Sequence, residues 1–389
     1  AGAAVIDADL EFGNGLQPVN VGNGSDAIDL IINGDLINAA GAGNLIQKLG
    51  PGTLQFPGDQ SAIAGGFRIG NVEGTPGIGG RVLIDHPNAL GAPNAALQVH
   101  EGTIEATADL TGANAIPRNL TISSGDIGPA ILQGSPMAFM GDLVLETYDF
   151  EPTNHRLRVN TAVHFAGELR DGNFAYGLTI DGTGKLTVAA PTNTYEGNIT
   201  LNGPDVTIDG TLSEIGIFSM STGTLRTGAS IGGTMIIGNG IGEDTTIDVA
   251  NGIGTFAIEN MTLFGDVTLK LQIDRTTAAV TADKISATGN VQLGAGIVTL
   301  DLEVIGSEPI LEGTQITLLE RTTVGSIGGF FEALPDGTEF LLGDQLFRID
   351  YNVGIGANDL IITAIPEPMS GALVPVGIAS ILAFRRPRN

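Results

Sequence analysis

The chain has 389 residues, a net charge of -26, 58 glycines and neither cysteine nor tryptophan. The acidic balance excludes nucleic acid as a default partner, because phosphate binding needs Lys and Arg to displace counterions. The missing cysteines exclude disulfides, thiolate chemistry and Cys-based metal sites. An apolar fraction of 42% is enough for a core, and the glycine content predicts many short strands joined by turns rather than helices.

The sequence begins Ala-Gly-Ala-Ala, without Met and without an apolar signal segment. Removal of a secretory signal leaves a start of small residues like this one, although a trimmed chain would begin in the same way. We expect an exported protein, with the second alternative open.

Residues 1–310 form the body of the chain and repeat a short phrase. A glycine turn leads into alternating apolar residues, as in GTLQF from Gly52, GTIEA from Gly102 and GKLTV from Gly184. Each copy predicts a strand of about five residues with every second side chain inward. Recurrent short strands at irregular spacing predict stacked coils, that is, a parallel β-helix. An array of β-sandwiches is the alternative, since its strands recur at similar intervals.

Four asparagines in the body fit the Asn-x-Ser/Thr acceptor pattern for glycosylation. They are Asn23, Asn119, Asn198 and Asn260. For the last three, a second interpretation is that they begin strands in which the Thr faces outward.

Three sets of residues in the body are candidates for catalytic or metal sites. Ser230 lies in GASIG, but the nucleophile motif needs a strand, a turn and a helix, and the following GTMIIGNG predicts a strand. The histidines lack the helical zinc spacing, and we expect them in exposed loops or strands. These are His86, His100, His155 and His164.

Parallel β-helices also host polysaccharide lyases and hydrolases, which need paired carboxylates. The candidates by count are Asp109, Asp142, Asp181 and Asp209. They lie at or near glycine turns, where Asp is common for backbone reasons, and aromatic residues are only 5% of the chain. We therefore expect no enzymatic activity and no cofactor, although the charge would permit weak, diffuse Ca²⁺ binding.

Residues 311–365 differ from the body in their aromatic content and their turn signals at Pro335-Asp336-Gly337 and Gly343-Asp344. Such a segment predicts an antiparallel meander that caps the last coil. Its aromatic residues are Phe330, Phe331, Phe340, Phe347 and Tyr351.

Residues 366–389 form a tail with three parts. Pro366, Glu367 and Pro368 precede sixteen uncharged residues, and Arg385 and Arg386 follow. As a helix the uncharged stretch would span about 24 Å, short of the roughly 30 Å hydrocarbon core. We expect a transient membrane contact with the basic end facing the cytoplasm.

Two stretches resemble the autotransporter-associated β-strand repeat. KLGPGTLQFPGDQ begins at Lys48, and GTGKLTVAAPTNTYEGNITLNG contains the centre Asn193-Thr194-Tyr195. The resemblance implies a right-handed parallel β-helix that is extracellular and structural or adhesive.

The tail resembles the PEP-CTERM sorting signal, through Pro366-Glu367-Pro368, the apolar spacer and Arg385-Arg386. This resemblance implies export, processing by a membrane-embedded exosortase, and a place in the envelope or extracellular matrix of Gram-negative-type bacteria.

The sequence thus predicts an exported, non-enzymatic structural protein of the cell surface or extracellular matrix. Its expected partners are an exosortase-like enzyme, further copies of itself and extracellular polysaccharide. Two alternatives stay open: a subunit of an extracellular filament that stacks head to tail, and a polysaccharide lyase or hydrolase on the same fold.

Overall fold

The computed structural model describes most of the chain up to Pro366. The described residues are 2–41, 43–71, 79–123, 128–146, 154–172, 174–212, 215–228, 230–240, 245–249, 252–295, 297–323, 325–354 and 358–366.

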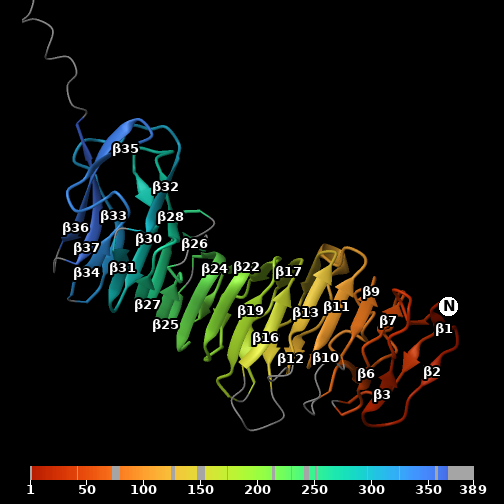
Figure 1. Cartoon of the computed structure of the whole chain (residues 1–389). Coiled ribbons are helices and arrows are strands. Elements are labelled where there is room, and N and C mark those ends of the chain that lie inside the picture. Colours follow the sequence, from red (N-terminus) through yellow and green to blue (C-terminus); the bar gives the residue numbers. More distant parts are fainter. Residues whose placement is uncertain are drawn as a thin grey trace, which may run out of the picture.

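The chain winds into coils that stack along one axis, with the N-terminus at one end and the last strands at the other (Figure 1). Each coil contributes to three columns of parallel strands. Column 1 begins with β1 (Ala4–Ile6), β4 (Leu30–Ile32), β7 (Thr53–Phe56), β9 (Arg81–Ile84), β11 (Gly102–Ala106), β13 (Ala130–Gly134), β16 (Asn154–Val159) and β19 (Gly177–Asp181).

Column 2 is sparse in the first coils, where isolated bridges and the short helix η1 (Gly112–Asn114) stand between its strands. Its strands there are β2 (Leu10–Glu11), β5 (Leu36–Ile37), β14 (Met137–Phe139), β17 (Ala162–Phe165) and β20 (Lys185–Val188).

Column 3 completes each coil and forms a separate sheet over the first coils. It contains β3 (Gln17–Asn20), β6 (Ile46–Leu49), β8 (Gly66–Ile69), β10 (Ala96–Val99), β12 (Leu120–Ile122), β15 (Leu143–Leu145) and β18 (Leu169–Asp171). The short strands β21 (Thr192–Asn193) and β23 (Thr211–Leu212) continue it.

In the central coils, long strands bend at a corner and serve two columns. The first half of β22 pairs with β19 and its second half with β20. These bent strands are β22 (Ile199–Ile208), β24 (Ile217–Thr227), β25 (Ser230–Ile237) and β27 (Thr255–Leu263). Around them lie β26 (Thr245–Val249), β28 (Val267–Asp274), β29 (Thr281–Ala282), β30 (Lys284–Ala287), β31 (Val291–Ala295), β32 (Thr299–Ile305), β33 (Gln315–Arg321) and β34 (Ile327–Phe330).

The core is a continuous stack of inward aliphatic and aromatic side chains. Along column 1, Leu157, Ile180 and Leu201 are register partners in successive coils and are buried. Along column 2, the rings of Phe139 and Phe165 stack with centroids 4.9 Å apart. Each coil buries its apolar face only against the next coil, which is how a solenoid builds its core.

Parallel pairing of successive coils confirms the predicted β-helix. It rules out the β-sandwich array, in which neighbouring strands along the chain would pair antiparallel.

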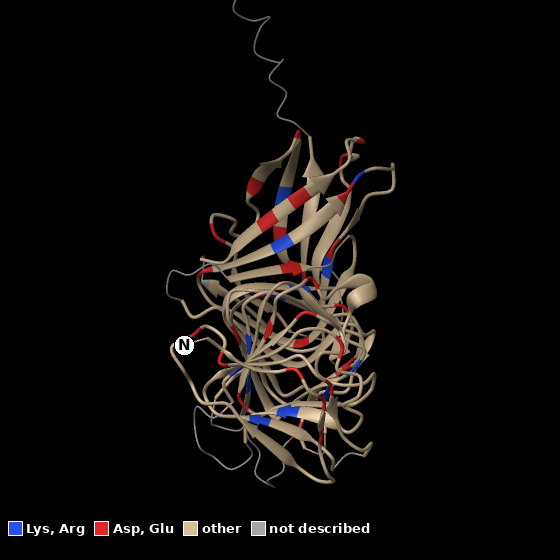
Figure 2. Ribbon diagram, turned by 90° about the vertical axis from the view of Figure 1, so that its right-hand side faces the viewer, with Lys and Arg blue, Asp and Glu red and all other residues tan. Residues whose placement is uncertain are grey.

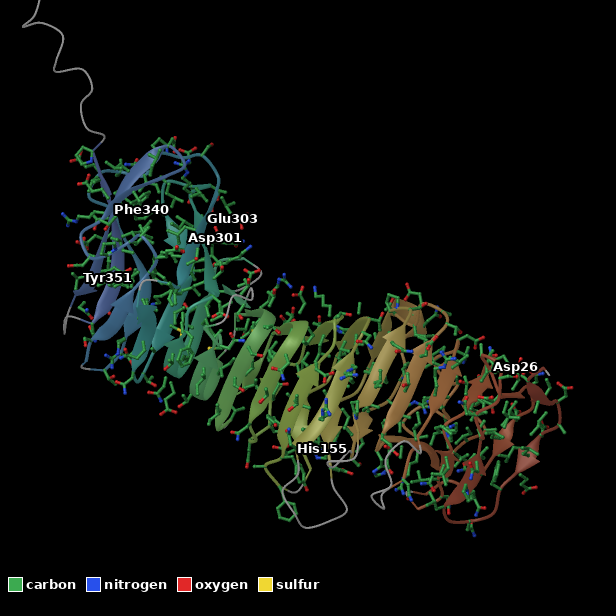
Figure 3. The ribbon with its side chains drawn as sticks, in the orientation of Figure 1. Asp26, His155, Asp301, Glu303, Phe340 and Tyr351 are labelled. Atoms are coloured by element: carbon green, nitrogen blue, oxygen red, sulfur yellow. The ribbon has the colours of Figure 1, made fainter. Side chains whose placement is uncertain are left out.

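The last strands form the predicted antiparallel cap. They are β35 (Glu339–Leu342), β36 (Gln345–Val353) and β37 (Asp359–Ile365), and β37 pairs with β33. Phe347 and Tyr351 of β36 are buried. Figure 3 labels Tyr351. The Tyr351 hydroxyl accepts a hydrogen bond from the N–H of Phe331 (3.1 Å) and donates one to the carbonyl of Leu334 (2.9 Å). Phe330, by contrast, is 41% exposed.

Asp and Glu are spread around the coils and over the cap, as the view from the N-terminal end shows (Figure 2). Among the described residues, no helix is long and apolar enough to cross a membrane.

Candidate functional site

The outer face of column 2 carries polar side chains in register from coil to coil. Thr187, Thr207, Arg226 and Asp248 are successive register partners. Because neighbouring strands lie about 4.8 Å apart, these side chains form a row along the axis of the β-helix.

Arg226 links three coils of this face. Its guanidinium donates to Asp205 (3.0 Å) and to Asp248 (3.2 Å), which lie on the strands before and after it. Two carboxylates therefore compensate its single charge.

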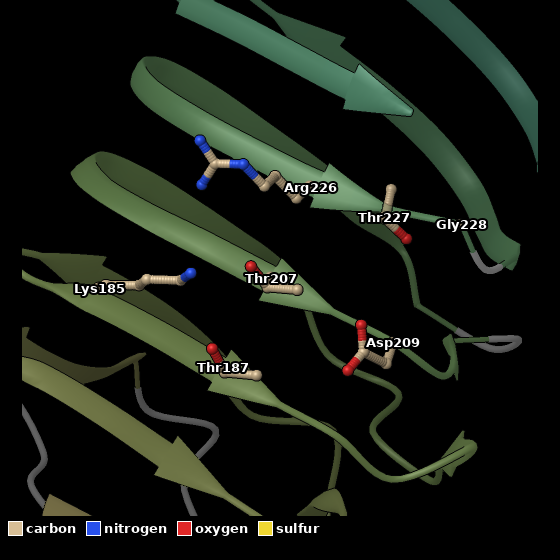
Figure 4. Close-up of a pocket in the computed structure, with 7 residues that line it drawn as sticks. All are labelled: Lys185, Thr187, Thr207, Asp209, Arg226, Thr227 and Gly228. Atoms are coloured by element: carbon tan, nitrogen blue, oxygen red, sulfur yellow. The ribbon is translucent and has the colours of Figure 1, made fainter. Parts of the chain in front are cut away.

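A hollow of 340 Å³ opens on the same face (Figure 4). Lys185 lies at one side and Asp209 at the other, with Thr187 and Thr207 between them. Lys185 and Asp209 are exposed, and within the described residues neither has an ion pair or a side-chain hydrogen bond. The Thr207 hydroxyl oxygen is buried without a hydrogen-bond partner in the same part of the chain. The hollow is lined by Lys185, Thr187, Thr207, Asp209, Arg226, Thr227 and Gly228.

A second hollow of 450 Å³ lies further along column 2. Lys270 pairs with Asp301 (3.7 Å), and Gln272 donates to Glu303 (3.2 Å) across it. Asp301 and Glu303 lie on the last strand of the column (Figure 3). Lys270 and the Gln272 amide nitrogen thus already bind acidic side chains of the next coil, whereas the Gln272 side-chain oxygen is buried without a partner among the described residues.

The lysine of the KLGPGTL phrase lies inside the coil and binds backbone carbonyls. Lys48 is completely buried, and its ammonium donates to the carbonyls of Leu49 (3.2 Å), Gly50 (2.6 Å) and Gly79 (3.1 Å). Burial lowers the pKa of Lys48 to about 8. The phrase therefore specifies a corner whose carbonyls point inward and need a donor.

The NTYEG phrase is also structural. Asn193 accepts a hydrogen bond from the N–H of Leu169 in the preceding coil (2.8 Å). Tyr195 is buried, and its hydroxyl lies within hydrogen-bonding distance of the carbonyls of Tyr176 and Asn198, to which its single proton can be donated in turn or shared. These bonds hold the corner between columns 3 and 1.

Three of the predicted glycosylation asparagines link coils through their side-chain oxygens. Asn119 accepts from the N–H of Asp142 (2.8 Å), and Asn198 accepts from the N–H of Ile217 (2.8 Å). Asn260 accepts from the N–H of Asn290 in the same way (2.9 Å). Asn23 lies instead in an exposed loop before β4. Glycosylation of these positions stays a prediction.

The expectation of exposed histidines is wrong for two of the four. His100 is 1% exposed, and His155 is fully buried with its ring 5.1 Å from that of Tyr176 (Figure 3). Burial lowers the pKa of His100 to about 4. The alternation of His155 with Leu157 along β16 was the available signal, since both occupy inward positions.

The other two histidines are at least partly accessible. His164 is on the outer face of β17, so it points away from the interior that holds His155. The His86 ring lies 4.0 Å from Asp59. Within the described ranges, no group of three or more His, Asp or Glu side chains is placed to hold a metal ion.

The four candidate carboxylates have different surroundings. Arg156 (3.1 Å) and Arg158 (2.7 Å) bind Asp181, and although partial burial opposes them they hold its pKa below the usual value. Asp142 pairs with Arg170 (2.9 Å), and Asp109 accepts bonds from Thr111. Asp209 alone lines the hollow of Figure 4.

Ser230 begins β25 and is followed by the rest of that strand rather than by a helix, so it lacks the context of the nucleophile motif. In the tail, Pro366 is exposed after β37. Glu367, Pro368, Arg385 and Arg386 lie outside the described residues.

The fold places the chain among parallel β-helix proteins. No family model matches the sequence, and the curated proteins contain no significant match. Among solved structures, the Haemophilus influenzae Hap adhesin is similar over 89% of this chain and 59% of its own length, at 12% identity and a TM-score of 0.20. The chain thus spans less than two thirds of that adhesin, and a similarity at this level carries no argument about function.

Proposed function

We propose that this chain is an exported, non-enzymatic structural protein of the bacterial cell surface or extracellular matrix, processed or anchored through its tail. The observation that supports this most is how the polar side chains of the coils are used. Arg226, Asn198 and Asp181 each bind a neighbouring coil, so side chains capable of chemistry are occupied in holding the rod together.

At the C-terminal end of the rod, two of the three columns favour a discrete particle over a head-to-tail filament. Column 3 ends where β37 covers β33 in antiparallel pairing. Column 1 ends at β34, where the Asn352 side chain accepts from the N–H of Ile327 (2.6 Å) and donates to its carbonyl (3.3 Å). Stacking of a new coil on this end would have to displace both.

The tail supports processing. Pro366, the first residue of the Pro-Glu-Pro triplet, is exposed directly after the last strand. A membrane-embedded enzyme could reach this residue without unfolding a coil.

Cell fractionation and intact mass test the proposal. The gene would be expressed in a Gram-negative-type host with and without an exosortase. We expect the protein outside the cytoplasm, with a mass that lacks the tail only when the exosortase is present. Replacement of Pro366, Glu367 and Pro368 by Ala should prevent removal of the tail. The control Pro335→Ala, in a turn of the cap, should still lose the tail when the exosortase is present. Cytoplasmic retention of all forms would refute the export, and an unchanged mass with the exosortase would refute the processing.

A separate assay addresses the enzyme alternative. A lyase or hydrolase would release unsaturated or reducing ends from polysaccharide, and Asp209→Asn would abolish that release. We expect no release from either neutral or acidic polymers. Sustained release that depends on Asp209 would replace the structural proposal with an enzymatic one.

A further inference from the structure

We propose that the hollow on column 2 between Lys185 and Asp209 is a binding site for a neutral polysaccharide. The inference rests on the proposed function only for the setting in which the protein would meet such a polymer. The site itself is argued from the side chains that line it.

The hollow offers each kind of group that a sugar hydroxyl needs. A hydroxyl both donates and accepts, as do the side chains of Thr187 and Thr207, which are neighbours in register. The Asp209 carboxylate only accepts and the Lys185 ammonium only donates, and both form the stronger, charge-assisted hydrogen bonds. Because the ammonium and the carboxylate flank the threonines, one ligand can use all four groups (Figure 4).

Lys185 and Asp209 differ from the charged residues further along the column in being available. Further along, Lys270 binds Asp301. In the hollow, by contrast, Lys185 and Asp209 form no ion pair or side-chain hydrogen bond within the described residues, although Lys185 lies beside Asp205, its register partner, and attracts its charge. The Thr207 hydroxyl oxygen is buried and unsatisfied in the same part of the chain. A buried polar atom without a partner is costly, and rotation of the Thr207 side chain toward the hollow would let a ligand hydroxyl bind this oxygen and remove that cost.

Charge selects a neutral polymer over an acidic one. The positive charge of Arg226 is already compensated by Asp205 and Asp248 at 3.0 and 3.2 Å. Within the hollow, the charge of Lys185 is opposed by that of Asp209. The net charge of -26 would repel a polyanion at longer range.

The size and the position of the hollow suit a segment of a polymer. Its 340 Å³ lies at the lower end of the roughly 300–1,000 Å³ of small-molecule sites. Lys185, Thr187 and Thr207 occupy the outward positions of β20 and β22, so the hollow opens on the outer face of the column and can take one part of a longer chain.

Binding of defined hexasaccharides to the purified chain tests the inference. The probes are cellohexaose, maltohexaose and laminarihexaose as neutral ligands, and hexamers of alginate and hyaluronan as acidic ones. Calorimetry should show binding of at least one neutral probe and weaker binding of both acidic probes.

Variants then locate the site. Thr187→Val with Thr207→Val should weaken the neutral ligand at least tenfold, and Asp209→Asn should weaken it by a similar factor. The matched control is Thr179→Val with Thr200→Val, a register pair on the outer face of column 1, which should leave affinity within twofold. Circular dichroism checks that each variant is folded.

Three results would overturn the inference: no neutral probe binds, an acidic probe binds more tightly, or the control pair loses as much affinity as the pair in the hollow. These results are distinguishable from failure of the proposed function. A protein that is exported but binds no glycan contradicts only the site, and one that binds through the hollow but stays in the cytoplasm contradicts only the export.

Discussion

The N-terminal coils and the central coils close the same kind of β-helix with corners of different length. From Ile104 to its register partner Leu132 the chain advances 28 residues, whereas from Met220 to Ile237 it advances 17. The long coils use separate strands and irregular corner segments. The short coils bend one strand through a corner, as β24 does at Gly223, whose φ of 104° suits glycine.

This difference decides what lies inside. Long corners turn carbonyl groups toward the interior, where each needs a donor. Arg118 supplies one to the carbonyls of Leu90 (2.8 Å) and Gly91, and Lys48 supplies another at its own corner. The interior of a short coil needs no such donor and is lined by residues such as Phe218 and Leu225. The burial of Arg118 and Lys48 thus follows from the long corners, whose carbonyls they bind.

The largest expected effect comes from the apolar interior of a central coil. Phe218 is completely buried between two neighbouring coils, so Phe218→Ala should lower the free energy of unfolding by about 3–5 kcal/mol. Phe12 belongs to the first coil and is only partly buried, so Phe12→Ala should cost roughly half as much or less. Urea unfolding followed by far-ultraviolet circular dichroism measures both. Equal losses would show that the first coil is as tightly packed as the centre.

The next effect tests the donors inside the N-terminal coils. Arg118 is 2% exposed, and Arg118→Met would leave two buried carbonyls without their donor, at a cost of about 2–4 kcal/mol. The matched control is Arg158→Met on the outer face of β16. Its ion pair with Asp181 is partly exposed, and we expect a loss of at most about 1 kcal/mol. If both variants lose the same stability, the buried guanidinium has no special role.

The sequence predicted the β-helix and its cap, with a β-sandwich array as the alternative that only the strand pairing excluded. Both predictions depend on local sequence patterns, namely the apolar alternation after glycine turns and the final segment rich in aromatic residues. The inward positions of Lys48, Arg118 and His155 were not predictable in this way. Charged side chains normally lie at the surface. Only the stacking of one corner on another shows that a buried carbonyl there lacks a hydrogen-bond donor.

The candidate site was predictable only in part. Asp209 was singled out from the sequence, although for a different chemistry. Its neighbours Lys185, Thr187 and Thr207 were missed because irregular coil lengths hide the register that places them together. Thr187 and Thr207 are twenty residues apart, and no pattern in that interval indicates that they lie on adjacent strands.

Lys48 should make the N-terminal coils sensitive to alkaline pH. The pKa of this buried amine is lowered to about 8, whereas in the unfolded chain it lies near 10.5. Between these values the unfolded chain holds more protons, so the free energy of unfolding should rise as pH increases, by about 1–2 kcal/mol from about pH 7.5 to about 9.5. Well below about pH 8 the amine is protonated in both the folded and the unfolded chain, so the free energy of unfolding no longer depends on pH through this group. The carbonyls that accept hydrogen bonds from the ammonium favour its charged form and oppose this rise.

Two variants separate Lys48 from other groups. Lys48→Met and Lys48→Arg each carry no group that titrates in this range, so their stability should stay flat over it. The measurement stops below about pH 10, because the pKa of buried Tyr351 is raised to about 12 and would lower stability at higher pH. An identical rise in the variants and the unaltered chain would assign the effect elsewhere.

The smallest expected effect belongs to the outer face of the central coils. Arg226→Gln removes the ion pairs with Asp205 and Asp248, but these groups are partly exposed, so we expect a loss of no more than about 1 kcal/mol. Because salt screens exposed charges, the loss should shrink further at about 1 M NaCl. The loss caused by Arg118→Met should persist in the same salt, because hydrogen bonds to buried carbonyls are hardly screened. If the loss of stability in Arg226→Gln did not change with salt, the outer face of column 2 would depend on buried charge in the same way as the corners.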